Sequence, residues 1–160
     1  GCWIASCNPT EPDMRLQTAV AAVMGVLPSL TFAAPELPVI ELTAGMHRIE
    51  AEVVNTQETR MRGLMMRQSM PAHRGMLFVF DADSRHCMWM KNTLLPLAVA
   101  FLDGQGRIIN VEEMQPRTED NHCAAKPARY ALEMNARWFS KRGLGAGTRL
   151  LGIDRAPPPR

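Results

Sequence analysis

The stretch GMLFVFDADSRHCMWMKNT, residues 75–93, decides the fold of this chain of 160 residues. Its first part, residues 76–80, is a continuous apolar run, which is typical of a strand that is buried on both faces. The polar residues 81–84 have short side chains that bond to their own backbone, and they predict a turn. Residues 85–91 then predict a returning strand, so the whole stretch is expected to form a central hairpin.

The segments on both sides of this stretch also have the patterns of short strands. Further strands are expected over residues 39–42, 46–54, 97–102, 107–114, 129–135 and 148–153. Residues 57–66 contain good helix formers with an apolar stripe at helical spacing, and residues 136–142 predict a short helix or turn. The elements together predict a mainly β domain, a compact antiparallel β sandwich or barrel of about seven to eight strands with one or two short helices.

The N-terminal part has the pattern of an export signal. Residues 14–33 begin with Met-Arg, continue with Ala, Val, Met and Leu, and end in Thr-Phe-Ala, which is the layout of a cleaved secretory signal peptide. The segment is too short and too interrupted, at Pro28, for a permanent transmembrane span; a buried core helix is the alternative. We therefore predict a protein that is periplasmic or secreted.

The other divisions of the chain follow from this signal. Residues 1–13 are expected to be an upstream extension, and residues 34–38 a linker that contains two prolines. A single β domain is predicted over residues 39–153, followed by a Pro-rich tail over residues 154–160. The formal net charge of +2 is too small to indicate nucleic acid as a partner.

Two cysteines, Cys87 and Cys123, lie in the expected mature chain. Because an exported protein meets an oxidising compartment, one expectation is a disulfide between them, and the other is two free, partly buried thiols. A thiol-dependent enzyme that uses one of them with His86 or His122 is a further alternative. Since neighbours on a strand point to opposite faces, His86 is poorly placed to activate Cys87.

The strongest polar constellation follows the expected returning strand. Lys91 and Asn92 leave a strand whose other residues are large and apolar, so their polar groups are expected to gather at one rim of the domain. Arginines from the helix would add charge there and form a cationic pocket that suits a carboxylate or a phosphate. The alternative is that the polar side chains satisfy loop backbone and the cations are solvated. The candidate residues are Arg62, Arg67, Trp89, Lys91, Asn92 and Thr93.

A second constellation is methionine-rich and points to a soft metal. On a strand over residues 85–91, His86, Met88 and Met90 would share one face, and thioether and imidazole ligands suit Cu(I). Successive residues on one face of a strand are about 7 Å apart, too far for one metal without help from another element. Methionine is also an adaptable core filler, so core packing is the favoured interpretation, and no metal or other cofactor is expected.

Several phrases occur in a recognisable order and resemble the domain of unknown function 192 family over roughly residues 39–153. They are Arg62-Gly63-Leu64-Met65 with Arg67, Gly75-Met76-Leu77-Phe78, Trp89-Met90-Lys91-Asn92-Thr93 with Pro96-Leu97, Phe101-Leu102-Asp103 with Gly106-Arg107-Ile108, and Tyr130, Leu132-Glu133 and Gly147. The resemblance implies a compact, mainly β domain, often behind a signal peptide or lipoprotein anchor, and implies no activity. The chain departs from the family pattern at Met88, Ala98 and Arg137.

The sequence contains no established catalytic motif such as G-x-S-x-G, H-E-x-x-H or C-x-x-C. We therefore expect a non-enzymatic binding or accessory module whose partner is a small anionic ligand or another protein, and no nucleic acid. A periplasmic copper-binding protein is the alternative, and a thiol-dependent enzyme is the further alternative.

Overall fold

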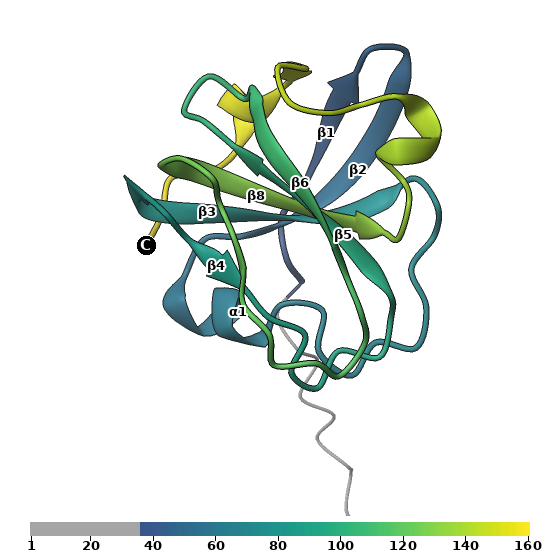
Figure 1. Cartoon of the computed structure of the whole chain (residues 1–160). Coiled ribbons are helices and arrows are strands. Elements are labelled where there is room, and N and C mark those ends of the chain that lie inside the picture. Colours follow the sequence, from purple (N-terminus) through teal and green to yellow (C-terminus); the bar gives the residue numbers. More distant parts are fainter. Residues whose placement is uncertain (1–35) are drawn as a thin grey trace, which may run out of the picture. The chain divides into compact units, whose positions relative to one another are not determined.

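Seven strands form one curled sheet in the order β6-β5-β8-β3-β2-β1-β9 (Figure 1). The computed structural model describes residues 36–160, so the expected signal peptide, the extension before it and the first two residues of the expected linker lie outside the described residues. The strands are Val39–Ala44 (β1), His47–Val54 (β2), Arg74–Ser84 (β3), Leu97–Leu102 (β5), Ile108–Met114 (β6), Ala128–Asn135 (β8) and Leu150–Leu151 (β9). Cys87–Met88 (β4) and His122–Cys123 (β7) form a second, two-stranded sheet.

The two edges of the large sheet meet and close it into a barrel. β9 pairs with β1, while the segment just before β9 bonds to the start of β6. The Ile108 N–H donates to Thr148 O at 2.8 Å, and the Leu150 N–H donates to Gly106 O at 2.8 Å. Closure leaves few free edge groups, so it protects the sheet against pairing with other chains. The prediction of a mainly β fold is confirmed.

The β2–β3 pair is parallel, whereas the other strand pairs are antiparallel. A parallel pair needs a long crossover, and this one is supplied by the helix Gln57–Arg62 (α1) and the loop after it. The helix begins at Thr56 with a reciprocal capping box to Thr59 and ends at Gly63, where φ is +46°. It is shorter than residues 57–66 because Gly63 turns the chain there, so that Leu64 enters a core and Met61 remains exposed.

The hairpin expected over residues 75–93 is not formed. β3 continues through the expected turn as far as Ser84, and the returning segment forms only the short β4, which pairs with β7. The physical reason is that both edges of β3 are already occupied, by β2 on one side and by β8 on the other. A hairpin over this stretch would need the returning chain to pair with residues 76–80 of β3, and residues 76–78 already have a strand on each side.

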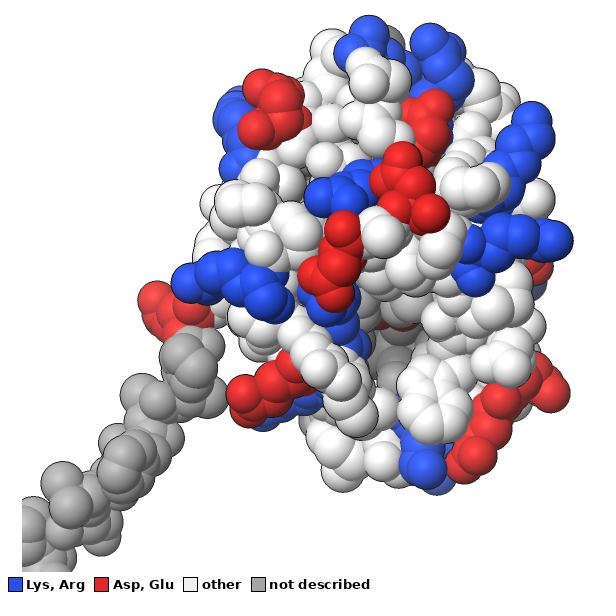
Figure 2. All heavy atoms as spheres, turned by 90° about the vertical axis from the view of Figure 1, so that its left-hand side faces the viewer, with Lys and Arg blue, Asp and Glu red and all other residues white. Residues whose placement is uncertain are grey.

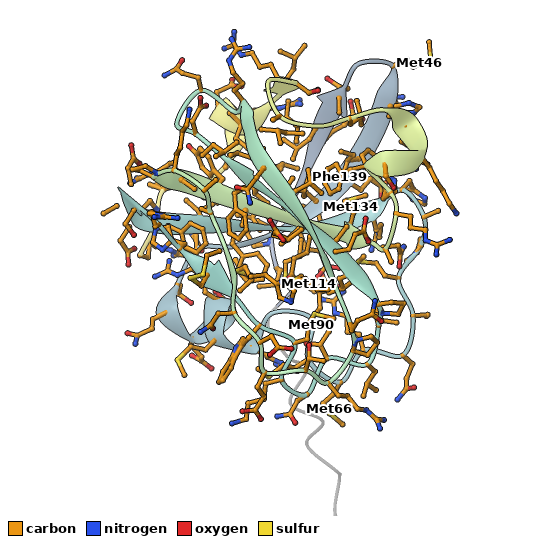
Figure 3. The ribbon with its side chains drawn as sticks, in the orientation of Figure 1. Met46, Met66, Met90, Met114, Met134 and Phe139 are labelled. Carbon is orange, nitrogen blue, oxygen red and sulfur yellow. A yellow bond between two sulfur atoms is a disulfide. The ribbon has the colours of Figure 1, made fainter. Side chains whose placement is uncertain are left out.

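Alternate residues of the strands face two separate cores. All seven strands of the closed sheet contribute to the inner core, for example through Leu42, Leu77 and Leu132. The second core lies on the outer face, where Met76 and Phe78 pack with residues from the covering segments such as Leu64, Met90 and Leu95. Figure 3 shows Phe139 and Met134 of the inner core above Met114 and Met90 of the second core. The two cores explain why residues 76–80 form a continuous apolar run, as predicted.

Two short 3-10 helices complete the described chain, Ser140–Arg142 (η1) and Ile153–Arg155 (η2). The C-terminal tail is fixed to the residue that follows β2, because the Asn55 side chain donates to Pro158 O at 2.6 Å and the Arg160 N–H donates to Asn55 O at 2.7 Å. No helix within residues 36–160 has the length and apolar character needed to span a membrane.

Close packing of β3 against β8 predicts that Gly75 does not accept a side chain. A Cβ atom at Gly75 would lie 2.6 Å from Glu133 O, which is a backbone atom and cannot move aside without moving the strand. Gly75→Ala is expected to lower the free energy of unfolding by about 1–3 kcal/mol in urea denaturation. Gly104→Ala is the matched control, because a Cβ there meets no atom within 4 Å. Equal stability of the two variants would contradict this packing.

Candidate functional site

Three loops meet at one end of the barrel, which we call the loop end. They are residues 63–67 after α1, residues 89–95 after β4 and residues 115–118 after β6. Asn92 lies in the left-handed region with φ +55°, where Asn is favoured among residues with side chains, and this conformation turns the middle loop. The loops are joined by main-chain hydrogen bonds from Met66 N–H to Asn92 O (2.9 Å), from Met90 N–H to Thr118 O (3.1 Å) and from Arg117 N–H to Thr93 O (3.1 Å).

The middle loop places four of the predicted site residues together. Trp89 is 45% exposed, and the Lys91 Nζ atom lies 5.1 Å from the centre of its ring, in the range of a cation–π contact. Lys91 and Asn92 are exposed, whereas Thr93 is buried and its Oγ1 atom lies 3.4 Å from Lys91 O. The loop therefore exposes one cation and one amide to solvent, whereas the Thr93 hydroxyl contacts the backbone of its own loop.

The two predicted arginines behave differently. Arg62 is exposed at the end of α1 and forms no ion pair within residues 36–160. Arg67 makes a two-fold contact with Glu52 of β2, in which Nη1 donates to Oε1 at 2.6 Å and Nη2 donates to Oε2. The hydrogen bond from Arg67 lowers the pKa of Glu52, and the same bond raises the pKa of Arg67. Arg67 thus fixes its loop to the barrel, and its charge is already neutralised.

Glu133 is a buried acidic residue that the sequence does not predict as part of the site. It lies on β8 between Met76 of β3 and Val99 of β5, and only 4% of it is exposed. Because side chains alternate along a strand, it faces the second core together with Ala131. Burial raises the pKa of its carboxyl from 4.5 to about 8, so the group is mostly protonated at pH 7.

No side chain or backbone group within residues 36–160 makes a hydrogen bond to the Glu133 carboxyl. Within that range, no side-chain nitrogen or oxygen is both fully enclosed and without a partner, so the unpaired oxygens of Glu133 retain a small opening. Figure 2 faces the side that carries α1 and β4, and it shows a hollow in the lower half of that side. A buried polar group without a partner needs an explanation, and a bound molecule is one.

The small sheet packs against the second core through Met88 of β4. In the structure Cys87 and Cys123 lie opposite each other on β4 and β7, and their sulfur atoms are joined at 1.99 Å. The Asn110 side chain on β6 holds β7 down, because Nδ2 donates to Cys123 O at 3.1 Å and Oδ1 accepts from Ala125 N–H at 3.0 Å. In this state neither sulfur is a free thiolate, which is the form that acts as a nucleophile.

The residues considered for a soft metal have other contacts in the structure. The His86 ring stacks on Phe80 with 3.7 Å between ring centres, and its Nε2 atom lies 2.8 Å from Ala82 O. Met90 is fully buried in the second core, and Met88 is half-buried against it. The common face expected for these three residues required a strand over residues 85–91, and only Cys87–Met88 forms one.

The raised pKa of Glu133 predicts how stability changes with pH. Between pH 4.5 and about 8 the folded state keeps a proton that the unfolded state releases, so the free energy of unfolding decreases as pH rises. At about 1.4 kcal/mol per pH unit, the Glu133 contribution is at most about 5 kcal/mol over this interval. Glu133→Gln is expected to remove this part of the slope in urea denaturation at a series of pH values. Parallel profiles for wild type and variant would contradict the burial of this carboxyl.

Loss of the sulfur–sulfur bond is expected to loosen the cover of the second core. The bond spans 36 residues, so its removal restores chain entropy to the unfolded state. Replacement of Cys87 and Cys123 with Ser is expected to lower the free energy of unfolding by about 3 kcal/mol, measured without reductant. Reductant should destabilise wild type and leave the double variant unchanged; an equal response of both would contradict the pairing.

Comparisons with known proteins agree with this architecture. The chain resembles a crystal structure from Sinorhizobium meliloti 1021, described as a candidate transcription regulator, with 31% identity and a TM-score of 0.69 over 76% of this chain and 98% of the other. It also resembles a protein of unknown function from Novosphingobium aromaticivorans DSM 12444, with 26% identity and a TM-score of 0.68 over 79% of this chain and 98% of the other. A comparison with curated proteins finds no match. The model of the DUF192 family, described as uncharacterized ACR, matches residues 39–152, and the chain therefore belongs to that family.

Proposed function

We propose that this domain is an exported, non-enzymatic binding module that holds a small apolar molecule with a carboxylate group at the loop end. The observation that carries the proposal is Glu133, a carboxyl that is buried and unpaired in the second core. A protein gains nothing in stability from such a group, and sites of function are where this kind of cost is usually found.

The rim of the loop end favours an anion. Arg62, Lys91 and Arg117 are exposed, and none of them forms an ion pair with an acidic residue of the described chain. Arg117 was not among the predicted residues, and its N–H bond to Thr93 O places it at the same loop. Arg67 takes no part, because Glu52 neutralises it.

The floor of the site favours an apolar ligand. Glu133 lies in a row between Met76 and Val99, and the core around it includes Met90 and Leu95. A protonated carboxyl does not repel an anionic ligand and is able to donate one hydrogen bond to it. The apolar body would gain free energy from burial, while the cationic rim would orient the carboxylate.

Export is supported by two features. The pattern of residues 14–33 is that of a cleaved signal peptide, and the bond between Cys87 and Cys123 suits an oxidising compartment such as the periplasm. The proposal includes no nucleic acid, since Figure 2 shows Lys and Arg interspersed with Asp and Glu over the face that carries α1 and β4.

Titration calorimetry with octanoate at pH 6.5 and pH 9 tests the proposal. If binding requires protonated Glu133, raising the pH to one unit above its pKa of about 8 weakens the affinity of wild type about tenfold. Glu133→Gln cannot ionise, so its affinity is expected to be the same at both pH values. Lys91→Ala is expected to weaken binding about fivefold at both, through loss of the rim cation.

Lys141→Ala is the matched control, because Lys141 is an exposed lysine on η1, away from the three loops. It is expected to bind octanoate like wild type. Failure of wild type to bind octanoate, or equal binding by wild type at both pH values, would overturn the proposed ligand and the role of Glu133.

A further inference from the structure

A hollow of about 380 Å³ lies far from the loop end, between the β1–β2 turn, the segment before β3, and η1. Met46 stands at its edge, and Figure 3 shows Met46 and Met66 at opposite ends of the molecule. Met66 belongs to the loop end, so the two sites are separate. The sequence does not predict this hollow, because its walls come from three segments that are distant in sequence.

Trp138 fixes the walls of the hollow. Its indole Nε1–H donates to Ala72 O at 2.8 Å, and the ring is almost completely buried. The His47 ring stands edge-on to it with 6.1 Å between ring centres. The Arg142 guanidinium lies 4.3 Å from the centre of the indole ring, and its Nη1 donates to Trp138 O at 3.0 Å. The Trp138 and Arg142 side chains are therefore held in place before any ligand arrives.

The hollow is lined by basic side chains and by no acidic one. Arg142 and His47 form no ion pair within residues 36–160, and the Arg142 Nη2 and Nε donors make no hydrogen bond there. Arg48 is the third basic residue, and its Nη2 atom lies 2.8 Å from Glu41 at an exposed position, where a pair exchanges readily with solvent. The first three basic side chains thus come from β2 and η1.

His73 supplies the fourth basic side chain from the segment before β3. Its Nε2 atom lies 3.7 Å from Glu50 Oε2, and the same carboxylate oxygen accepts from Arg74 Nε at 3.1 Å. Glu50 is therefore shared with Arg74 and is not among the residues that line the hollow. Each wall of the hollow therefore carries at least one basic side chain, and no acidic side chain is among the lining residues.

We propose that this hollow binds a phosphate group, either as free phosphate or as part of a small phosphate monoester. The forked guanidinium groups of Arg142 and Arg48 match the oxygens of a phosphate, and the imidazoles of His47 and His73 add donors from two other directions. The volume suits a small ligand, since it lies within the range of about 300–1,000 Å³ found for small-molecule sites. The site acts independently of the octanoate site proposed above.

Nuclear magnetic resonance of the indole N–H groups tests this inference directly, because each site contains one tryptophan. Trp138 reports on the hollow, and Trp89 reports on the loop end. Glycerol 3-phosphate and inorganic phosphate are the probes, with glycerol as the uncharged control at matched ionic strength. The Trp138 resonance is expected to shift in a saturable manner with either phosphate probe and to be unaffected by glycerol, and the Trp89 resonance is expected to stay in place.

Two variants locate the binding at the arginines. Arg48→Gln and Arg142→Gln are each expected to weaken the binding of glycerol 3-phosphate about tenfold. Arg48 is largely exposed, so its variant is expected to fold even if Arg142→Gln does not. Arg149→Gln is the matched control and is expected to bind like wild type, because Arg149 is exposed on another part of the chain, where its Nε donates to Gln105 O.

The inference is supported if phosphate shifts the Trp138 resonance and leaves the Trp89 resonance in place, and if the Trp138 shift is lost in the Arg48 variant. Absence of a Trp138 shift with both phosphate probes overturns it, and so does equal binding by wild type and Arg48→Gln. These outcomes are distinct from failure of octanoate binding, which concerns Glu133 and the loop end.

Discussion

The structure depends on the first half of β3, where residues 75–80 are buried and residues 76–78 are paired on both edges. β2 and β8 occupy the edges, and the two cores take the alternating side chains of residues 75–80. A strand in this position contributes backbone hydrogen bonds and apolar burial on every side, and it leaves no edge for the chain that follows it. The segment after Ser84 therefore turns away from the sheet and becomes part of the cover over the second core.

The segment after Ser84 helps to form a cover over the second core, and a candidate site lies under this cover. The cover consists of β4, β7 and the loops of the loop end, all held by bonds to one another or to the barrel, such as those made by Asn110 and Arg67. Under it, Glu133 occupies a place that an apolar residue would fill at lower cost. Glu52 lies on the other side of Met76 from Glu133, and its carboxylate is paired with the Arg67 guanidinium. A carboxylate in this part of the sheet is therefore able to find a partner. Glu133 has none within the described chain, and that contrast is the reason to assign it a role.

The sequence predicts those parts of the fold that depend on neighbouring residues. The strands expected over residues 97–102 and 107–114 form β5 and β6, and the turn between them is local, because Asp103 Oδ1 accepts from the N–H groups of Gln105 and Arg107, at 2.8 and 2.9 Å. The failed hairpin after β3 has comparable turn residues, yet its outcome is decided by β2 and β8, which are distant in sequence. Local turn chemistry is a preference of about 1 kcal/mol or less, and strand pairing on two edges outweighs it.

The candidate site likewise has features that neighbouring residues predict and features that depend on residues distant in sequence. The exposure of Lys91 and Asn92 follows from a polar exit after large apolar residues, and the sequence predicts it. The partner of Arg67 and the burial of Glu133 depend on strand register, since Glu52, Met76 and Glu133 are neighbours only when β2, β3 and β8 are aligned. The hollow at Trp138 depends on three segments that are distant in sequence.

β8 carries Glu133 near its C-terminal end and leads through Asn135 to Trp138, and Asn135 is itself anchored to Met70 O at 3.0 Å. One strand thus positions both sites, but coupling between them would require two arrangements of that strand with different affinities. A strand paired on both sides and fixed at its end has one arrangement, so the physical basis for independent binding is the same constraint on the central sheet that builds the fold.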